Sequence, residues 1–164
     1  MKPILLSSCA RAATAAEARF RIDAPLVPAR ATRVVALDPA AAEVVRRASD
    51  FPWHTARFYT GAAPAPGEVA DVVLRSVEGV DTWLSDELTG VDSVVMVATA
   101  NDGAAVASAI GDACTVSGIM TAGLVLAEGH DTRLAVAALR PHARVLLVTE
   151  DDDDVVEILT ALRA

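Results

Sequence analysis

The chain has 164 residues, of which 53% are apolar and 4% are aromatic. This length and composition exclude a disordered chain or a linker and predict one folded domain over residues 1–164, with a core mainly of valine, leucine, isoleucine and alanine. The formal net charge of −8 argues against nucleic acid and anionic membranes as partners.

The cellular compartment is predicted from the cysteines and from the apolar runs. Cys9 and Cys114 have no metal-binding or redox spacing and are expected to be free thiols in a reducing cytosol. The apolar run Ile4–Leu6 is shorter than the roughly 7–15 residues that a signal peptide needs. No stretch reaches the roughly 18 apolar residues of a membrane span. We therefore expect a cytoplasmic protein without a membrane partner.

Two strand–helix units are predicted in the first third of the chain. Apolar runs of strand length at Pro3–Leu6 and Arg33–Leu37 each precede a stretch rich in helix-forming residues. The expected helices cover Ala10–Arg21 and Ala40–Ala48. Pro39 suits the first turn of the second helix, because its missing N–H costs nothing there.

The next segment is predicted to be irregular and then helical. Asp50–Gly67 holds most of the aromatic residues and several prolines and glycines, so we expect a long excursion over one edge of the sheet, with a short strand at Ala56–Tyr59. Apolar residues in Val69–Leu88 recur at steps of three and four, which predicts an amphipathic helix of about 20 residues ending at Gly90. The run Val72–Leu74 alone would indicate a strand, but the longer pattern favours the helix.

The second half of the chain alternates between strands and helices. Strands are predicted at Ser93–Thr99, Ile119–Leu126 and Arg144–Val148, and each is followed by a helix, the last one after the acidic run Glu150–Asp154. This alternation predicts an α/β fold, specifically a three-layer α/β/α, Rossmann-like domain with a mostly parallel sheet and right-handed crossovers.

The turn after the central strand supplies the first candidate site residues, because ligands of open α/β sheets bind beyond the carboxyl ends of the strands. Thr99 and the sequence Asn101-Asp102-Gly103 lie in this turn, where helix N–H groups can hold an anion. Asp102 would compete for those donors and repel phosphate. Capping of their own helix by these residues is therefore favoured over an anion site.

Asp38 follows the second predicted strand, where dinucleotide-binding folds place an acid that bonds a ribose hydroxyl. The turn after the first strand, Ser7-Ser8-Cys9-Ala10, contains no glycine, so the glycine fingerprint of those folds is missing. An aspartate before a proline is also an ordinary helix N-cap. The N-cap is the favoured interpretation, and a ligand contact is the alternative.

No metal site and no catalytic residue is predicted. The acids of Glu150–Asp154 could suggest Mg²⁺, but consecutive acids point in different directions, and they suit the N-terminus of the last helix. The three histidines are widely separated, and no serine or cysteine has the context of an activated nucleophile. These observations favour a protein that is not an enzyme.

Several segments, taken in chain order, resemble one known family. They are Arg33–Val44, the long predicted helix that leads through Thr89–Asp92 into Val94–Val97, Gly118–Val125, Glu128-Gly129 with Arg133, and Leu139–Leu159. In order and spacing they resemble the nucleotide-binding half of the tubulin/FtsZ cell-division GTPases. The resemblance implies guanine nucleotide as the cofactor, with Asp38, Glu128 and Arg133 among the residues that hold it.

The sequence departs from this family at the turns that would bind phosphate. The glycine-rich signature loop after Thr99 is shortened to Ala100-Asn101-Asp102-Gly103, and Ser7 and Ser8 stand in the first glycine-rich turn. Arg133 lies one residue later than the family spacing, and the catalytic loop and C-terminal domain of the family do not follow. These departures predict a degenerate nucleotide fold without catalysis.

The favoured function is that of a non-catalytic domain that acts through a protein partner or through self-assembly into a homo-oligomer, with Phe51–Tyr59 as a candidate contact surface. The alternative is a small-molecule- or nucleotide-binding domain, or an enzyme, whose site lies at the carboxyl ends of the strands and includes Asp38, Thr99–Asp102, Glu128 and Asp151. A receiver-type signalling domain is a third hypothesis, disfavoured because Thr149-Glu150 stands in place of the expected lysine.

Overall fold

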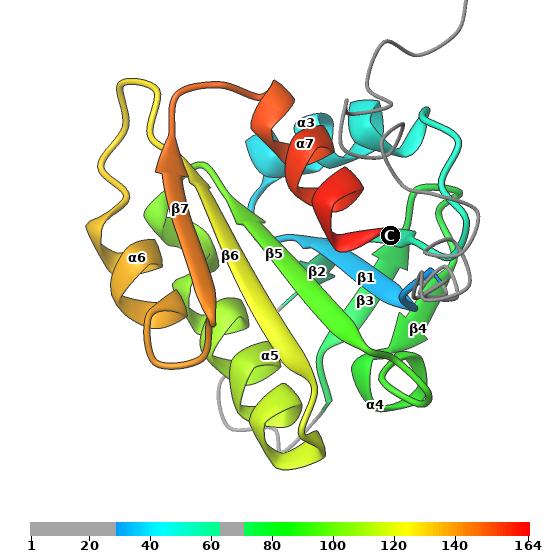
Figure 1. Cartoon of the computed structure of the whole chain (residues 1–164). Coiled ribbons are helices and arrows are strands. Elements are labelled where there is room, and N and C mark those ends of the chain that lie inside the picture. The colour runs from blue at the N-terminus through cyan, green and yellow to red at the C-terminus, as the bar shows by residue number, and fades with distance from the viewer. Residues whose placement is uncertain (1–28, 63–70) are drawn as a thin grey trace, which may run out of the picture.

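The computed structural model describes residues 29–62 and 71–164, and within them the chain forms one seven-stranded sheet accompanied by five α-helices (Figure 1). The strands are β1 (Thr32–Ala36), β2 (Arg57–Ala62), β3 (Val73–Ser76), β4 (Asp81–Trp83), β5 (Ser93–Ala98), β6 (Met120–Leu126) and β7 (Val145–Thr149). The helices are α3 (Pro39–Ser49), α4 (Leu84–Glu87), α5 (Ala104–Ser117), α6 (Arg133–Leu139) and α7 (Asp153–Leu162), with a short 3₁₀ turn, η1 (Asn101–Gly103), before α5.

The sheet is mixed and mostly parallel, with the strand order β4-β3-β2-β1-β5-β6-β7. Strands β2, β1, β5, β6 and β7 are parallel, whereas β3 is antiparallel to both β2 and β4. The parallel strands are laid down outward from β1 in both directions, so the order reverses between β1 and β5. In open α/β sheets such a reversal opens a crevice at the carboxyl ends of the two strands.

Two hydrophobic clusters hold the helices against the sheet. In one, Ile110 of α5 and Leu139 of α6 pack with Val35 and Met96 of the sheet. In the other, side chains of α3 and α7, including Val45 and Leu159, pack with Val34, Val95 and other sheet residues. Strands β1 and β5 are buried along their whole length, as expected for strands covered on both faces.

The four strands predicted from apolar runs in the described part of the chain are confirmed, each within one residue at either end. The short strand expected at Ala56–Tyr59 is also confirmed, as part of β2. The expectation that Asp50–Gly67 passes over an edge of the sheet is wrong, because β2 lies in the interior of the sheet between β1 and β3. The strand predicted at Pro3–Leu6 and the helix at Ala10–Arg21 lie outside the described residues.

The long amphipathic helix predicted for Val69–Leu88 is wrong. This segment forms β3, β4 and the four-residue helix α4, and Gly79 adopts a left-handed φ of +85° in the turn between the strands. Val77 and Val80, which the helix would have buried, are 42% and 64% exposed. The valine spacing imitated a helical period, but Leu74 and Arg75 alternate between buried and exposed as in a strand.

Two further sequence predictions concern a thiol and the membrane. Cys114 is a buried free cysteine, and burial raises the pKa of its thiol to about 11, so it stays protonated. In the described ranges, no helix combines the length and the apolar character that crossing a membrane requires.

Candidate functional site

The crevice between β1 and β5 is occupied by the side chain of Asp38. Asp38 follows β1, has extended backbone (φ −147°, ψ 166°) and is 4% exposed. Its Oδ1 accepts a hydrogen bond from Ala41 N at 2.9 Å, which confirms that it is the N-cap of α3. The carboxylate is therefore tied first to its own helix.

The same carboxylate also binds the turn after β5. Thr99 donates twice, from its N to Oδ2 at 2.7 Å and from its Oγ1 to Oδ1 at 2.6 Å, and Ala100 N donates to Oδ2 at 3.2 Å. With the bond from Ala41, two oxygens accept four hydrogen bonds, which is close to the capacity of an ionised carboxylate. Asp38 and Thr99 are thus brought together as predicted, but their polar groups form hydrogen bonds with each other.

Asn101 has a capping role, on a helix other than the one predicted. Its Oδ1 accepts from Leu134 N at 2.8 Å and from Ala135 N at 3.2 Å, so it caps the N-terminus of α6. Self-capping of the Asn101-Asp102-Gly103 turn is wrong, because the N-cap of α5 is Gly103, which has no side chain to cap with.

Gly103 is required by packing. A Cβ added to it would lie 2.4 Å from the carbonyl oxygen of Leu37 and 2.5 Å from the Leu37 Cβ. The turn after β5 therefore approaches the end of β1 too closely for any larger residue. Asp102 beside it is exposed to solvent.

The remaining predicted residues of the carboxyl ends lie on the surface. Arg133 pairs with Asp131 (Nη2 to Oδ2, 2.9 Å), and its side chain is 89% exposed. Hydrogen bonds from Arg133, with a smaller contribution from Asn101, hold the pKa of Asp131 well below its usual range. Glu128 is exposed, and its carbonyl oxygen lies 2.6 Å from His130 Nδ1. Ser7 and Ser8 lie outside the described residues.

The acidic side chains of the run Glu150–Asp154 do not share one partner. Asp152 pairs with Arg47 of α3, and Asp151 Oδ1 accepts from Asp153 N at 2.9 Å in the first turn. No three His, Cys, Asp or Glu side chains in the described ranges are grouped so that they could hold a metal ion. Asp153 and Asp154 lie in the first turn of α7, where they complement the helix dipole.

A second polar cluster, which sequence reasoning missed, lies at the opposite end of the sheet. Glu87 Oε2 accepts from Arg33 Nε at 2.9 Å and from Tyr59 Oη at 2.7 Å, and Arg57 Nη1 lies 3.6 Å away. Burial and the hydrogen bond to Glu87 raise the pKa of Tyr59 to about 12. Burial alone would raise the pKa of Glu87, but the bonds from Tyr59 and Arg33 outweigh it and lower that pKa. The feature of the sequence that could have indicated this cluster is Arg33, a charged residue within an apolar strand.

This cluster borders an open cavity of about 940 Å³, whose lining includes Arg57, Tyr59 and Glu87. The cavity also touches part of the aromatic segment Phe51–Tyr59. There Trp53 Nε1 donates to Ala48 O at 2.7 Å, and Phe58 and Tyr59 are buried, which leaves Phe51 as the exposed ring at 52%. Most of these aromatic side chains therefore serve the core.

Comparisons with known proteins add little to this geometry. No protein-family model matches the chain, and no curated protein does. A solved structure of proximal thread matrix protein 1 from the mussel byssus is similar with a TM-score of 0.43 and 8% identity. The match covers 80% of this chain and 44% of the mussel protein, so the chain spans less than half the length of that structure.

Proposed function

We propose that this chain is a non-catalytic α/β domain that acts through contacts with protein, either with a partner or with further copies of itself. The observation that carries the proposal is the saturation of the Asp38 carboxylate by Ala41, Thr99 and Ala100. An acid that held a ribose hydroxyl or a cation would have to give up these bonds, and burial makes their loss costly.

The surroundings of Asp38 support the same proposal. Asn101 serves the N-terminus of α6, and Gly103 packs against Leu37, so these two candidate residues of the turn have structural partners. The turn after β5 therefore joins this strand to the N-terminus of α3, through Asp38, and to the N-terminus of α6, through Asn101. Such a junction stabilises a scaffold and leaves few free groups to bind a small ligand.

A three-layer, Rossmann-like arrangement and a kinship with the tubulin/FtsZ nucleotide-binding domain are part of the proposal. The reversal of strand order between β1 and β5 and the distribution of the helices between two clusters support the first. The proposed kinship with the tubulin/FtsZ domain loses one supporting segment, because the long helix expected before Thr89 is instead a strand pair and a short helix. The proposed function rests on the hydrogen bonds of Asp38 and does not depend on this kinship.

The alternative is a ligand-binding domain or enzyme at the same end of the sheet. Its supporting observation is that Asp102 and Glu128 are exposed acids after the adjacent parallel strands β5 and β6. Under this alternative, a ligand would contact these two side chains and Arg133 above the closed crevice.

Measurements of nucleotide hydrolysis and of nucleotide binding distinguish the proposed non-catalytic domain from the alternative, a ligand-binding domain or enzyme. Purified chain is incubated with GTP or ATP and Mg²⁺, and phosphate release and equilibrium binding of a fluorescent guanine nucleotide are measured. The proposal expects no phosphate release above the blank and no saturable binding. Hydrolysis that falls in a Glu128→Gln, Arg133→Gln variant would contradict it and support the alternative.

A further inference from the structure

Strand β7 is the last strand of the sheet in the described part of the chain. It is hydrogen-bonded to β6 on one side and has no neighbour on the other among the described residues. Its five residues, Val145-Leu146-Leu147-Val148-Thr149, carry no charge, and Val145 and Val148 are 55% and 50% exposed. In Figure 1, α7 lies over the middle of the sheet, and β7 stands clear of it. An apolar, unpaired edge of this kind is a template for another strand.

The opposite edge of the sheet is protected in the usual ways. Strand β4 is three residues long, and its Asp81 forms an ion pair with Arg75 of β3 at 2.7 Å. Short length and charge on an edge strand are devices that prevent pairing with other chains. The two edges therefore differ, and the difference points to β7 as a surface for contact.

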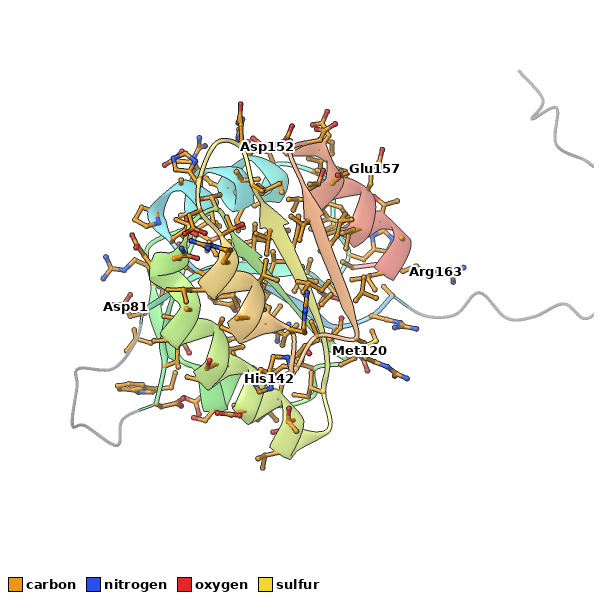
Figure 2. The ribbon with its side chains drawn as sticks, turned by 90° about the vertical axis from the view of Figure 1, so that its left-hand side faces the viewer. Asp81, Met120, His142, Asp152, Glu157 and Arg163 are labelled. Atoms are coloured by element: carbon orange, nitrogen blue, oxygen red, sulfur yellow. The ribbon has the colours of Figure 1, made fainter. Side chains whose placement is uncertain are left out.

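The charges that flank β7 have opposite signs at its two ends. Arg140 and Arg144 precede the strand, and the run Glu150–Asp154 follows it. Figure 2 faces this edge and shows His142 at the lower end of β7 and Asp152 at the upper end. Arg144 and Glu150 are both exposed, and neither side chain has an ion pair or hydrogen bond within the described part of the chain.

We propose that β7 pairs antiparallel with β7 of a second copy of this chain, about a two-fold axis near Leu147. This inference rests on the proposed function and names the partner. Antiparallel pairing brings Arg144 of each copy beside Glu150 of the other, so both ends of the interface attract. Parallel pairing would bring the basic ends together and the acidic ends together, which is unfavourable.

The same antiparallel arrangement would cover Val145 and Val148, which are exposed in the single chain. With Leu147 on the axis, Val145 lies opposite Thr149 of the other copy, and Leu146 lies opposite Val148. Because side chains alternate between the faces of a strand, each face of the joined edge gains an apolar row. The two seven-stranded sheets then become one continuous sheet, and main-chain hydrogen bonds satisfy both edges.

The first test is the mass of the full chain in solution, measured by sedimentation equilibrium over a range of concentrations. The wild-type chain is expected at twice the mass of one chain, and Val148→Lys is expected to shift it to a single chain. Val116→Lys is the matched control, since Val116 is an 89% exposed valine at the end of α5. If Val148→Lys does not fold by circular dichroism, Val145→Lys replaces it, with the same expected shift.

The second test reverses the flanking charges. Arg144→Glu and Glu150→Arg each place like charges together at the interface and should weaken the dimer at least about tenfold. The double variant restores opposite charges and should recover most of the affinity. Recovery supports antiparallel pairing about Leu147, because this register places these two residues directly opposite each other.

Three outcomes would overturn the inference. They are a wild-type chain of single mass at every concentration, a dimer that Val148→Lys and Val116→Lys affect equally, and a double charge variant as weak as the single ones. None of them bears on nucleotide hydrolysis or binding, so this inference and the proposed function fail separately.

Discussion

Thr99 donates two hydrogen bonds to Asp38, a residue 61 positions earlier in the chain, from its backbone N and from its Oγ1. The two residues follow the carboxyl ends of adjacent parallel strands, β1 and β5, at the point where the strand order reverses. A position that commonly faces a ligand is thus used to fasten two loops.

Replacing Asp38 should destabilise the fold because its carboxylate is buried and fully used. Asp38→Asn keeps the shape but turns an NH₂ group toward backbone donors, and we expect the free energy of unfolding to fall by about 2–3 kcal/mol. Thr99→Val, which removes one of the four bonds, should cost about 1–2 kcal/mol. Urea unfolding measures both, with exposed Asp102→Asn as the control that should change stability by less than about 0.5 kcal/mol. Equal stability of Asp38→Asn and this control would refute the structural role of Asp38.

Asn101 should act on α6 through its side-chain oxygen. Asn101→Ala removes the cap of Leu134 N and Ala135 N and should lower the free energy of unfolding by about 1 kcal/mol. Asn101→Asp keeps an acceptor at the helix N-terminus and should retain most of that stability. Hydrogen exchange of the first-turn amides of α6 locates the effect. Equal protection in Asn101→Ala and the wild type would show that the cap contributes nothing.

Gly103 should tolerate no added methyl group. Gly103→Ala places a Cβ against backbone atoms of Leu37, which cannot move aside as a flexible side chain could, so a loss of about 1–3 kcal/mol is expected. Ala105→Ser adds an atom at an exposed position two residues away and should be neutral. A Gly103→Ala variant as stable as Ala105→Ser would contradict the close approach of the two loops.

Tyr59 provides a test of the polar cluster, since it is the only tyrosine of the chain. Its pKa is raised in the folded state from 10.0 to about 12, so the folded state is favoured below pH 10 and loses this stabilisation as the pH rises toward 12. The tyrosinate absorbance of the folded chain should therefore titrate near pH 12, and the alkaline loss of stability should be smaller in Tyr59→Phe. Titration near the ordinary pKa of 10.0 would mean that Tyr59 is neither buried nor bonded to Glu87.

The parallel strands could be predicted because each is a continuous apolar run, as in β1 and β5, which is the pattern of a strand covered on both faces. The N-cap role of Asp38 could be predicted because a cap depends on neighbouring residues, here Pro39 and Ala41. Its bonds to Thr99 could not, since they depend on β1 and β5 being adjacent, which is a property of the whole sheet.

The strand pair β3–β4 was missed for a local reason. Valines at steps of three and four satisfied a helical period, although Gly79 in their midst takes a left-handed conformation that a helix interior does not allow. The cluster of Arg33, Tyr59 and Glu87 was missed because its members come from three separate elements, and only the charge in an apolar strand hinted at it.

The crevice between β1 and β5 is closed by the chain itself and leaves no room for a nucleotide. Thermal unfolding of the full chain with and without millimolar GTP, GDP or ATP and Mg²⁺ measures whether a nucleotide binds there. A ligand at 100 times its Kd would add about 2.7 kcal/mol to the stability of the folded state and raise the midpoint clearly. We predict the same midpoint with every nucleotide. A rise with guanine nucleotides alone, absent in Glu128→Gln and Arg133→Gln variants, would contradict the account and identify a working nucleotide site.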